Sequence, residues 1–351
     1  MFTPQRCPHS DCRRHTVPGD ECFFVRHGRY RAKCRAHAVP RFKCRACGRT
    51  FSRQTFRQCY RDHRPDLNAL VLVQLVSGTG LRQTARIVGA NRHTVMRKFR
   101  KIGLQLGRLN RNLQREIGTQ SITLLMDEFE SYEGRRNTRP VTVPMLIEKE
   151  SDFIIASRAA PIRPRGKKTD ARERAIARDA ARFGVRKDRS RGALRLVLRA
   201  GAKLCAKVDS IALRTDEKRS YPGLIRRAFG HGRVTHDTTS SKVARDTLNP
   251  LFRINHAEAM ARDLNGRLRR ESWLVSKKFE RLNLQLEIYM AHKNYVRPRF
   301  NVDRKTPAQF LGLYDRRVSP TELLAWRQDL GPATLHPFEP SGSSLLSEYA
   351  A

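Results

Sequence analysis

Four cysteines near the start of the chain have the spacing of a metal site. Cys7 and Cys12 bracket PHSD, and Cys44 and Cys47 bracket RA within FKCRACGRTF. Structural zinc needs four soft ligands, which two tight turns can deliver. Gly48 lets the backbone of the second turn face its amides toward the thiolates. We therefore expect a zinc ribbon whose ligands are Cys7, Cys12, Cys44 and Cys47.

The segment between the two cysteine pairs leaves other ligands open. It is longer than the roughly 15–20 residues usual between such pairs. Cys22, Cys34 and His37 lie in it, and His9 lies inside the first pair. The alternative to zinc is a set of unliganded core cysteines. A module of about 60 residues with few large apolar groups would hardly fold without a metal, which favours zinc.

Two aspartates further along the chain follow apolar, strand-like runs. Asp127 follows ITLLM, and Asp216 follows SIALRT. The runs SITLLMDEFE, PVTVPMLIE and SDFIIASR are together typical of a three-stranded meander. Two carboxylates at the ends of neighbouring buried strands can share divalent cations, as two-metal phosphoryl transfer requires. The alternative for each aspartate alone is a turn or cap residue.

The composition points to a polyanionic partner. The 351 residues include 71 Lys and Arg against 33 Asp and Glu, for a formal charge of +38. Such a balance speaks against a metabolic enzyme for small neutral substrates and favours nucleic acid. There is no run of 18 apolar residues and no signal-peptide core, so we expect no membrane span. Eight cysteines in such a chain indicate metal or reduced thiols, and we expect a cytoplasmic protein associated with the nucleoid.

Residues 65–112 have the pattern of a helix-turn-helix domain. Apolar spacing predicts helices over 67–76, 81–88 and 92–102, with Gly89 ending the second and Asn91 capping the third. The third helix presents basic and polar side chains that fit a major groove. We expect DNA contacts from Arg82 on the second helix and from Arg92, His93, Thr94, Arg97, Lys98 and Arg100 on the third. The alternative is a helical bundle with a solvated basic face.

The order of these features resembles that of bacterial insertion-sequence transposases with an N-terminal zinc ribbon, a helix-turn-helix and a ribonuclease-H-like catalytic domain. The matching segments are CRACGRTF, TGLRQTARIVGANRHTVMRKF, MDEFESY, LRTDEKRSY, NHAEAMARDLNGRLRRESWLVSKKFERL and NYVRPRFNVDRKTPAQFLGL. The resemblance implies a multidomain α+β fold: a zinc ribbon over 1–60, a helix-turn-helix domain over 61–112, an α/β ribonuclease-H-like domain with a mixed central sheet over 118–325, and a loosely ordered tail over 326–351.

The resemblance also implies the catalytic residues. In that family the first acidic ligand comes from a DE pair, which falls here on Asp127 with Glu128. The second comes from a strand that ends in TD, with an aromatic shortly after, and falls on Asp216 with Tyr221.

A third ligand opens a long helix in that family, and a basic residue follows it by seven positions. Counting back from the RLRR segment places these roles on Asn255 and Arg262. Asn departs from the Glu common in this superfamily. Its amide oxygen can ligate Mg²⁺ but brings no charge, so Glu258 and His256 stay as rivals.

Residues near these ligands carry further expectations. Basic residues after the long helix face phosphates or solvent: Arg267, Arg269 and Arg270. Trp273 packs on the catalytic domain, with stacking on a flipped base as the alternative. The segment that contains His236 forms a structural turn.

Together these features predict a DNA transposase that binds terminal inverted repeats and carries out metal-dependent cleavage and strand transfer. Asp127, Asp216 and Asn255 hold Mg²⁺ or Mn²⁺, and zinc stabilises the ribbon. Two element ends must be joined, so a homodimer or higher oligomer is expected on double-stranded DNA. The alternative is a zinc-ribbon/helix-turn-helix transcription regulator with a non-catalytic C-terminal domain. A weaker third possibility is a nuclease that cuts structured DNA without strand transfer.

Overall fold

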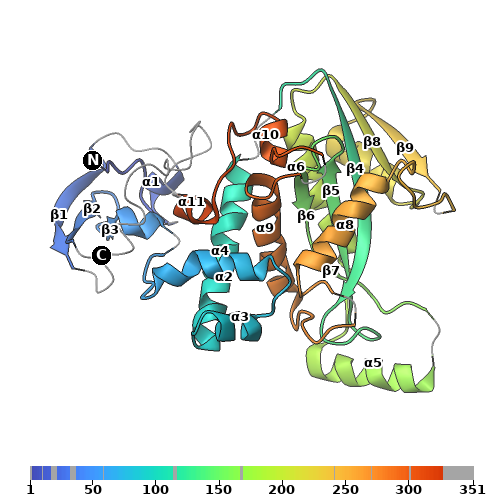
Figure 1. Cartoon of the computed structure of the whole chain (residues 1–351), viewed down its shortest axis with the longest axis horizontal. Helices are drawn as coiled ribbons and strands as arrows, with labels where there is room; N and C mark the ends of the chain where they lie inside the picture. Colours follow the sequence, from blue (N-terminus) through green and yellow to red (C-terminus); the bar gives the residue numbers. More distant parts are fainter. Residues whose placement is uncertain are drawn as a thin grey trace.

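A computed structural model of the chain has an α+β fold with a mixed sheet, as the sequence predicts (Figure 1). It describes residues 2–9, 11–16, 22–31, 37–57, 59–113, 117–166, 169–240, 242–269, 271–299 and 302–326. The candidate ligand Cys34, the predicted DNA contact Arg270 and nearly all of the predicted tail lie outside these residues. Within the described residues, no helix is long and apolar enough to cross a membrane.

The N-terminal module is a small three-stranded antiparallel sheet. Its elements are α1 (Arg13–Thr16), β1 (Phe24–Tyr30), β2 (Val39–Cys44), β3 (Thr50–Ser52) and the 3₁₀ helix η1 (Arg53–Phe56). The strands pair in the order β1-β2-β3. Four buried phenylalanines and three buried cysteines make a separate core for this module: Phe23, Phe42, Phe51, Phe56, Cys7, Cys12 and Cys44.

A helical segment follows, with a 3₁₀ turn and three helices. These are η2 (Pro65–Leu67), α2 (Asn68–Leu75), α3 (Leu81–Ile87) and α4 (Arg92–Leu113). Gly89 has φ +61°, and the Asn91 side chain accepts a hydrogen bond from the His93 amide at 2.9 Å. The predicted end of α3 and start of α4 are therefore confirmed.

Helix α4 is longer than the sequence predicts, because its second half packs against α9 (Phe279–Tyr295). A Cβ placed on Gly103 would lie only 2.8 Å from the Cβ of Leu284, so this glycine lets the two helices approach closely. The Asn110 amide donates to the backbone oxygen of Glu287 at 3.0 Å. Tertiary packing thus extends the helix beyond residue 102.

The central sheet has six strands and mixed direction. Its strands are β4 (Ser121–Tyr132), β5 (Pro140–Glu148), β6 (Ile154–Ser157), β7 (Ala160–Pro161), β8 (Ser210–Asp216) and β9 (Val234–Thr239). The order is β6-β5-β4-β8-β9, with β7 paired to β5. The predicted meander over β4, β5 and β6 is antiparallel, whereas β4, β8 and β9 are parallel.

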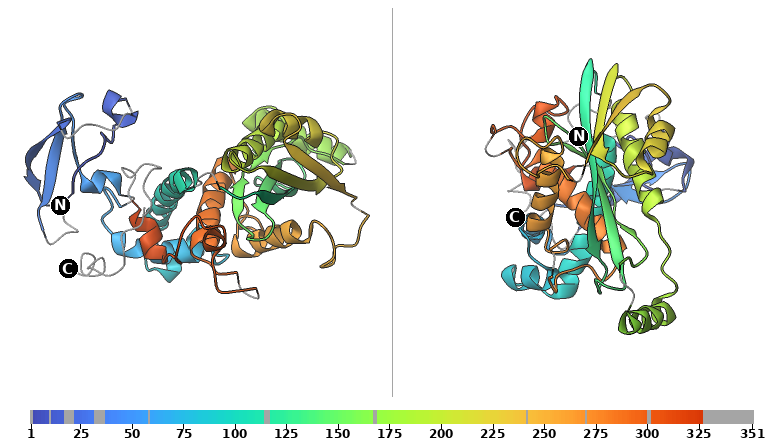
Figure 2. Two further views of the ribbon diagram at one scale, coloured as in Figure 1. Left: turned by 90° about the horizontal axis from the view of Figure 1, so that it is seen from above. Right: turned by 90° about the vertical axis from the view of Figure 1, so that its right-hand side faces the viewer.

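Helices cover both faces of this sheet (Figure 2). Residues Leu124 and Met126 face a core that includes α6 (Ser190–Leu204) and α7 (Tyr221–Phe229). Residues Leu125 and Phe129 face a second core with α8 (Phe252–Leu264) and part of α9. Successive side chains of a strand point to opposite faces, so β4 separates the two cores. The remaining helices are α5 (Asp170–Phe183), α10 (Pro307–Phe310) and α11 (Pro320–Ala325).

The helical segment and the sheet share one hydrophobic core. A single cluster of buried residues runs from Val71 on α2 through Phe99 on α4 to Trp326, and also takes in Leu124. Helix α9 additionally closes the edge of the sheet, because Asn294 exchanges two hydrogen bonds of 2.9 Å with the backbone of Ile154. The predicted boundary near residue 112 therefore does not separate two cores.

Candidate metal centres and nucleic-acid interface

Four cysteines of the N-terminal module converge on one point. Cys7 and Cys12 precede α1, Cys44 ends β2, and Cys47 lies in the turn to β3. Their Sγ atoms all lie within 4.8 Å of one another. The Cys7–Cys47 and Cys12–Cys44 Sγ distances are 3.7 and 3.8 Å. A tetrahedral zinc with Zn–S bonds of about 2.3 Å requires S···S separations of about 3.8 Å, so these four cysteines are placed to bind a metal ion such as zinc.

The surroundings of the cluster suit thiolate ligands. Gly48 has φ +69°, and its amide donates to the Cys44 oxygen at 2.9 Å, which closes the second turn. Burial raises the pKa of Cys7. At Cys47 burial acts in the same direction, but hydrogen bonds from the Arg49 backbone and side chain outweigh it and lower the pKa to about 7. Among the described residues this is the one group of three or more His, Cys, Asp or Glu side chains close enough to share a metal, and it leaves out Cys22, His9 and His37.

Asp127 and Asp216 lie side by side on neighbouring strands. The parallel β4–β8 ladder pairs Leu124 with Leu213 and Leu125 with Arg214, and the same register two residues further sets Asp127 opposite Asp216. Asp127 shares its face of β4 with Leu125 and Phe129, which pack toward α8. The prediction that Asp127 lies at a strand end is wrong, because β4 continues to Tyr132 in its pairing with β5.

The two carboxylates influence each other electrically. Burial raises the pKa of Asp127, and the charges of Asp216 and Glu128 raise it further. The Glu128 amide, which donates to Asp127 Oδ1 at 2.6 Å, and the charge of Arg245 act in the opposite direction. Both aspartates are half-buried, and a half-buried pair of carboxylates that repel each other is a favourable place for a cation. Arg245 lies in the segment after β9, and no sequence pattern pointed to it.

Glu128 faces the other side of β4 and is already engaged. It accepts hydrogen bonds from Tyr221 at 2.9 Å and from Thr142 at 2.7 Å, and it pairs with Lys218. The aromatic residue after the TD segment thus anchors the glutamate of the DE pair, which leaves Asp127 as the free carboxylate of that pair for a ligand.

Helix α8 carries Asn255 along the face on which the aspartates lie. Near the start of α8, Arg253 pairs with Asp152 at 3.0 Å. Asp152 lies in the turn between β5 and β6, which is beside the first residues of β4. Further along, the Arg262 guanidinium lies 4.9 Å from the centre of the Phe129 ring. The helix therefore runs in the same direction as β4, from the level of its start to the level of Phe129. Asn255 and Arg262, seven residues apart, share one side of α8, opposite Arg253.

The rivals for the third ligand lie on the same helix. Glu258, one turn after Asn255, is buried with 6% of its surface exposed. His256 is more exposed, and its ring stacks on Phe252 with centroids 6.3 Å apart. His256 lies a helical step of about 100° from Asn255, so the helix directs the two side chains differently.

Most of the predicted DNA contacts in the helical segment are on the surface. Arg82, Arg92, His93 and Arg97 are exposed, and Thr94 is half-buried. Lys98 is a correction, because only 2% of it is exposed and its Nζ pairs with Asp62 at 2.7 Å. It lies three residues after Val95 and so faces the core of the helical segment rather than DNA.

Three further predictions need correction. The Arg267 guanidinium stacks 4.8 Å from the centre of the Phe99 ring and donates to Ser276 at 3.1 Å, so it joins α4 to the segment after α8 instead of facing phosphates. Trp273 does not pack on the sheet domain, because 93% of it is exposed. His236 lies within β9 rather than in a turn, and its Nε2 is 2.9 Å from the Thr215 hydroxyl.

The chain was also compared with known proteins. No protein-family model matches it, and no curated protein is significantly similar to it.

Proposed function

We propose that this chain is a DNA transposase of the zinc-ribbon, helix-turn-helix and ribonuclease-H-like type. The observation that carries the proposal is the register of the parallel strands β4 and β8, which, continued two residues past Leu125 and Arg214, sets Asp127 opposite Asp216 on the face along which α8 runs. The basic surface of α3 and α4 supports DNA binding, and the four-cysteine cluster supports a structural zinc.

In this proposal Asp127, Asp216 and Asn255 hold two Mg²⁺ or Mn²⁺ ions. The ions, when bound, make water a better nucleophile and neutralise charge on the phosphate. Two carboxylates and an amide supply a charge of −2, and phosphates complete the coordination. Arg262, on the same side of α8 as Asn255, would hold a phosphate oxygen.

The reaction follows from this arrangement. Water attacks the phosphodiester at the element end, a P–O bond forms as the bond to the 3′-oxygen breaks, and a free 3′-hydroxyl and a 5′-phosphate result. That 3′-hydroxyl then attacks a target phosphodiester, and the target 3′-oxygen leaves with the proton. The chain holds the two DNA segments in line and supplies charge; it forms no covalent intermediate.

Cleavage of DNA tests the proposal. The substrate is a plasmid that carries the chromosomal segment encoding this chain together with its flanks, and nicking is measured with and without Mg²⁺. Asp127→Ala and Asp216→Ala are each expected to lower the rate by at least about 10²-fold. Asp237→Ala is the matched control, because this aspartate lies on neighbouring β9 with 53% of its side chain exposed.

The runner-up function is a transcription regulator that binds specific DNA and cuts nothing. It would be favoured if the wild-type protein bound the flanking DNA but released no nicked product with Mg²⁺ or Mn²⁺. Equal cleavage by the parent and the Asp127→Ala protein would show that the catalytic residues are misassigned.

A further inference from the structure

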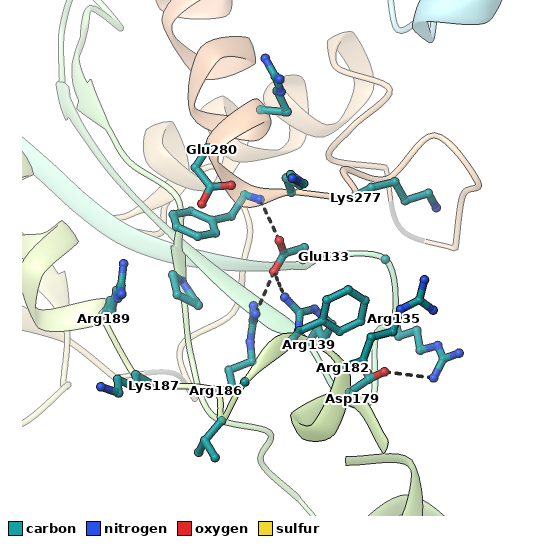
Figure 3. A pocket seen from close by; sticks show the side chains of 18 of the residues that line it. Glu133, Arg135, Arg139, Asp179, Arg182, Arg186, Lys187, Arg189, Lys277 and Glu280 are labelled. Atoms are coloured by element: carbon teal, nitrogen blue, oxygen red, sulfur yellow. Dashed lines mark hydrogen bonds and ion pairs between the residues drawn. The ribbon is translucent and has the colours of Figure 1, made fainter. Parts of the chain in front are cut away.

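A strongly cationic cleft lies away from the two aspartates. Its volume is about 1120 Å³, and its walls come from α4, the end of α5, the start of α9 and the turn between β4 and β5 (Figure 3). Ten Lys and Arg residues line it against three acidic residues. Sequence analysis did not single it out, because its walls come from four separate parts of the chain.

Two of the acidic residues that line the cleft, Glu133 and Asp179, pair with arginines that also line it. Glu133, at the centre of Figure 3, accepts hydrogen bonds of 2.8 Å from Arg139 and from Arg186. It also accepts one of 3.2 Å from the first amide of α9. Asp179 pairs with Arg135 at 3.2 Å. These contacts fix the floor of the cleft without using its outer cations.

The outer cations of the cleft have no such partners. Five exposed side chains at the rim form no ion pair with any residue that the structure describes: Arg100, Lys187, Arg189, Lys277 and Lys278. Figure 3 shows Lys187, Arg189 and Lys277 around Glu133, with no interaction drawn to any of them. Like charges held around one cleft repel one another, and a polyanion relieves that repulsion.

Apolar groups are exposed between these cations. Phe183 and Val185 are 54% and 81% exposed, and the Arg139 guanidinium lies 4.4 Å from the centre of the Phe183 ring. A mixture of cations and exposed apolar surface suits a sugar-phosphate backbone, which alternates charge with apolar sugar.

The cleft lies between the two parts of the proposed DNA path. On α4, residues His93, Arg97, Arg100 and Leu104 follow one another at spacings of four, three and four, so they form one stripe. Arg100 and Leu104 line the cleft, and the stripe therefore leads into it from the start of α4. On the other side, Glu133 directly follows the end of β4 and lies six residues after Asp127. Six extended residues span about 20 Å, which is the rise of about six base pairs.

We infer that this cleft binds the backbone of duplex DNA between the sequence held by the helix-turn-helix segment and the phosphodiester that reacts at the aspartates. The inference rests on the proposed function for the position of the reacting end. The binding of DNA in the cleft is measured independently of cleavage.

The test compares two variants that lose the same charge. One replaces Lys187, Arg189, Lys277 and Lys278 with Gln at the cleft rim. The control replaces Arg199, Lys203, Arg226 and Arg227 with Gln, all exposed on α6 and α7, across the sheet from α8. Binding of the flanking duplex DNA is measured by fluorescence anisotropy from 50 to 200 mM salt, together with thermal melting of each protein.

The cleft variant is expected to bind DNA about tenfold or more weakly at moderate salt. Its logarithmic salt slope should fall by up to about 3 to 4, since each phosphate contact contributes about 0.9. The control should change both quantities far less, and both variants should melt near the parent temperature because every replaced side chain is exposed. Equal effects of the two variants, or no effect of the cleft variant, would overturn the inference.

Cleavage by the parent protein separates this inference from the proposed function. A cleft-specific loss of binding in a protein that never cuts DNA would uphold the cleft and reject the transposase. Normal cleavage by the parent protein, with no loss of DNA binding specific to the cleft variant, would uphold the transposase and reject the cleft.

Discussion

The four-cysteine cluster and the aspartate pair that we propose to bind Mg²⁺ differ in how their ligand atoms are arranged. The four cysteine Sγ atoms lie within 4.8 Å of one another, and three of the four cysteines are buried in a module that has its own core. The aspartates lie on two neighbouring strands of a larger sheet, and the charge of Asp216 acts on Asp127. Four protein ligands complete the first arrangement, whereas the proposed function has ions and phosphate complete the second.

This difference follows from what each site must do. A structural zinc has four protein ligands and stabilises the fold that supplies them. A site for phosphoryl transfer keeps coordination positions open for the reacting groups. We therefore expect metal removal to unfold the N-terminal module and to leave the sheet intact, with a loss of catalysis alone.

Cys44→Ser is expected to have the largest effect on stability. Structural zinc contributes an apparent binding free energy of about 10–16 kcal/mol in small zinc modules, far more than the core of a module this size supplies. The variant should lose its bound zinc and unfold over residues 1–60, while the sheet domain melts as in the parent. Zinc content and hydrogen exchange of the two parts measure this.

Cys22→Ser is the matched control, because this cysteine is exposed and outside the cluster. It should retain one zinc per chain and the protection of the module. A Cys44→Ser protein whose N-terminal module is folded without metal would contradict this prediction. The four cysteines would then be core residues that need no zinc.

Asn255→Ala is expected to have the next largest effect, on catalysis rather than stability. Loss of a third ligand should reduce Mg²⁺-dependent nicking by about 10²-fold. Asn255→Asp keeps a ligand oxygen and should retain most of the activity. Glu258→Gln is the decisive companion: if it abolishes nicking while Asn255→Ala does not, the third ligand is one turn further along α8.

Local signals in the sequence predicted much of both sites. Cysteine spacing, the Gly48 turn and the Asn91 cap depend on neighbouring residues, and the structure has all three. The β4–β5–β6 meander was also predictable, because its strands are adjacent in the chain. The pairing of β4 with β8 spans a longer separation. The strand-end positions of Asp127 and Asp216 suggested that they could lie together, and the family resemblance strengthened that prediction.

Contacts between distant segments could not be predicted. Lys98 looked exposed on a basic helix, but its position on the inner side of α4 pairs it with Asp62. The predicted third helix ended at residue 102, whereas α4 continues to Leu113 because α9 supplies a surface for its second half. The cationic cleft depends on four elements meeting, although the excess of basic residues over 158–203 was a partial signal.

Asp127→Asn is expected to have a smaller and opposite effect, an increase in stability without metal. Burial and the neighbouring carboxylates raise the folded-state pKa of Asp127. A raised carboxyl pKa means that stability is highest below the unfolded-state pKa and falls as pH rises through the folded-state pKa. At neutral pH the neutral amide avoids that cost, so the melting temperature should rise.

Thermal melting at pH 7 with EDTA, and then with Mg²⁺, measures this effect. Mg²⁺ should stabilise the parent and leave Asp127→Asn almost unchanged. Asp237→Asn is the control, since that side chain is 53% exposed. A variant that melts below the parent without metal would mean that the aspartate pair is structural, like the cysteines.

The smallest expected effect is a change in tryptophan fluorescence. The chain has two tryptophans, of which Trp273 is 93% exposed and Trp326 is 1% exposed. Trp273 lies between α8 and α9, four residues before Lys277 at the rim of the cleft. DNA that fills the cleft should therefore alter the emission of Trp273 and leave that of Trp326 unchanged. Trp273→Phe should remove the DNA-dependent change yet keep DNA affinity within about threefold, because Phe also stacks. If the DNA-dependent change in fluorescence persisted in Trp273→Phe, the DNA would lie away from Trp273. The cleft would then not lead the DNA to the aspartates.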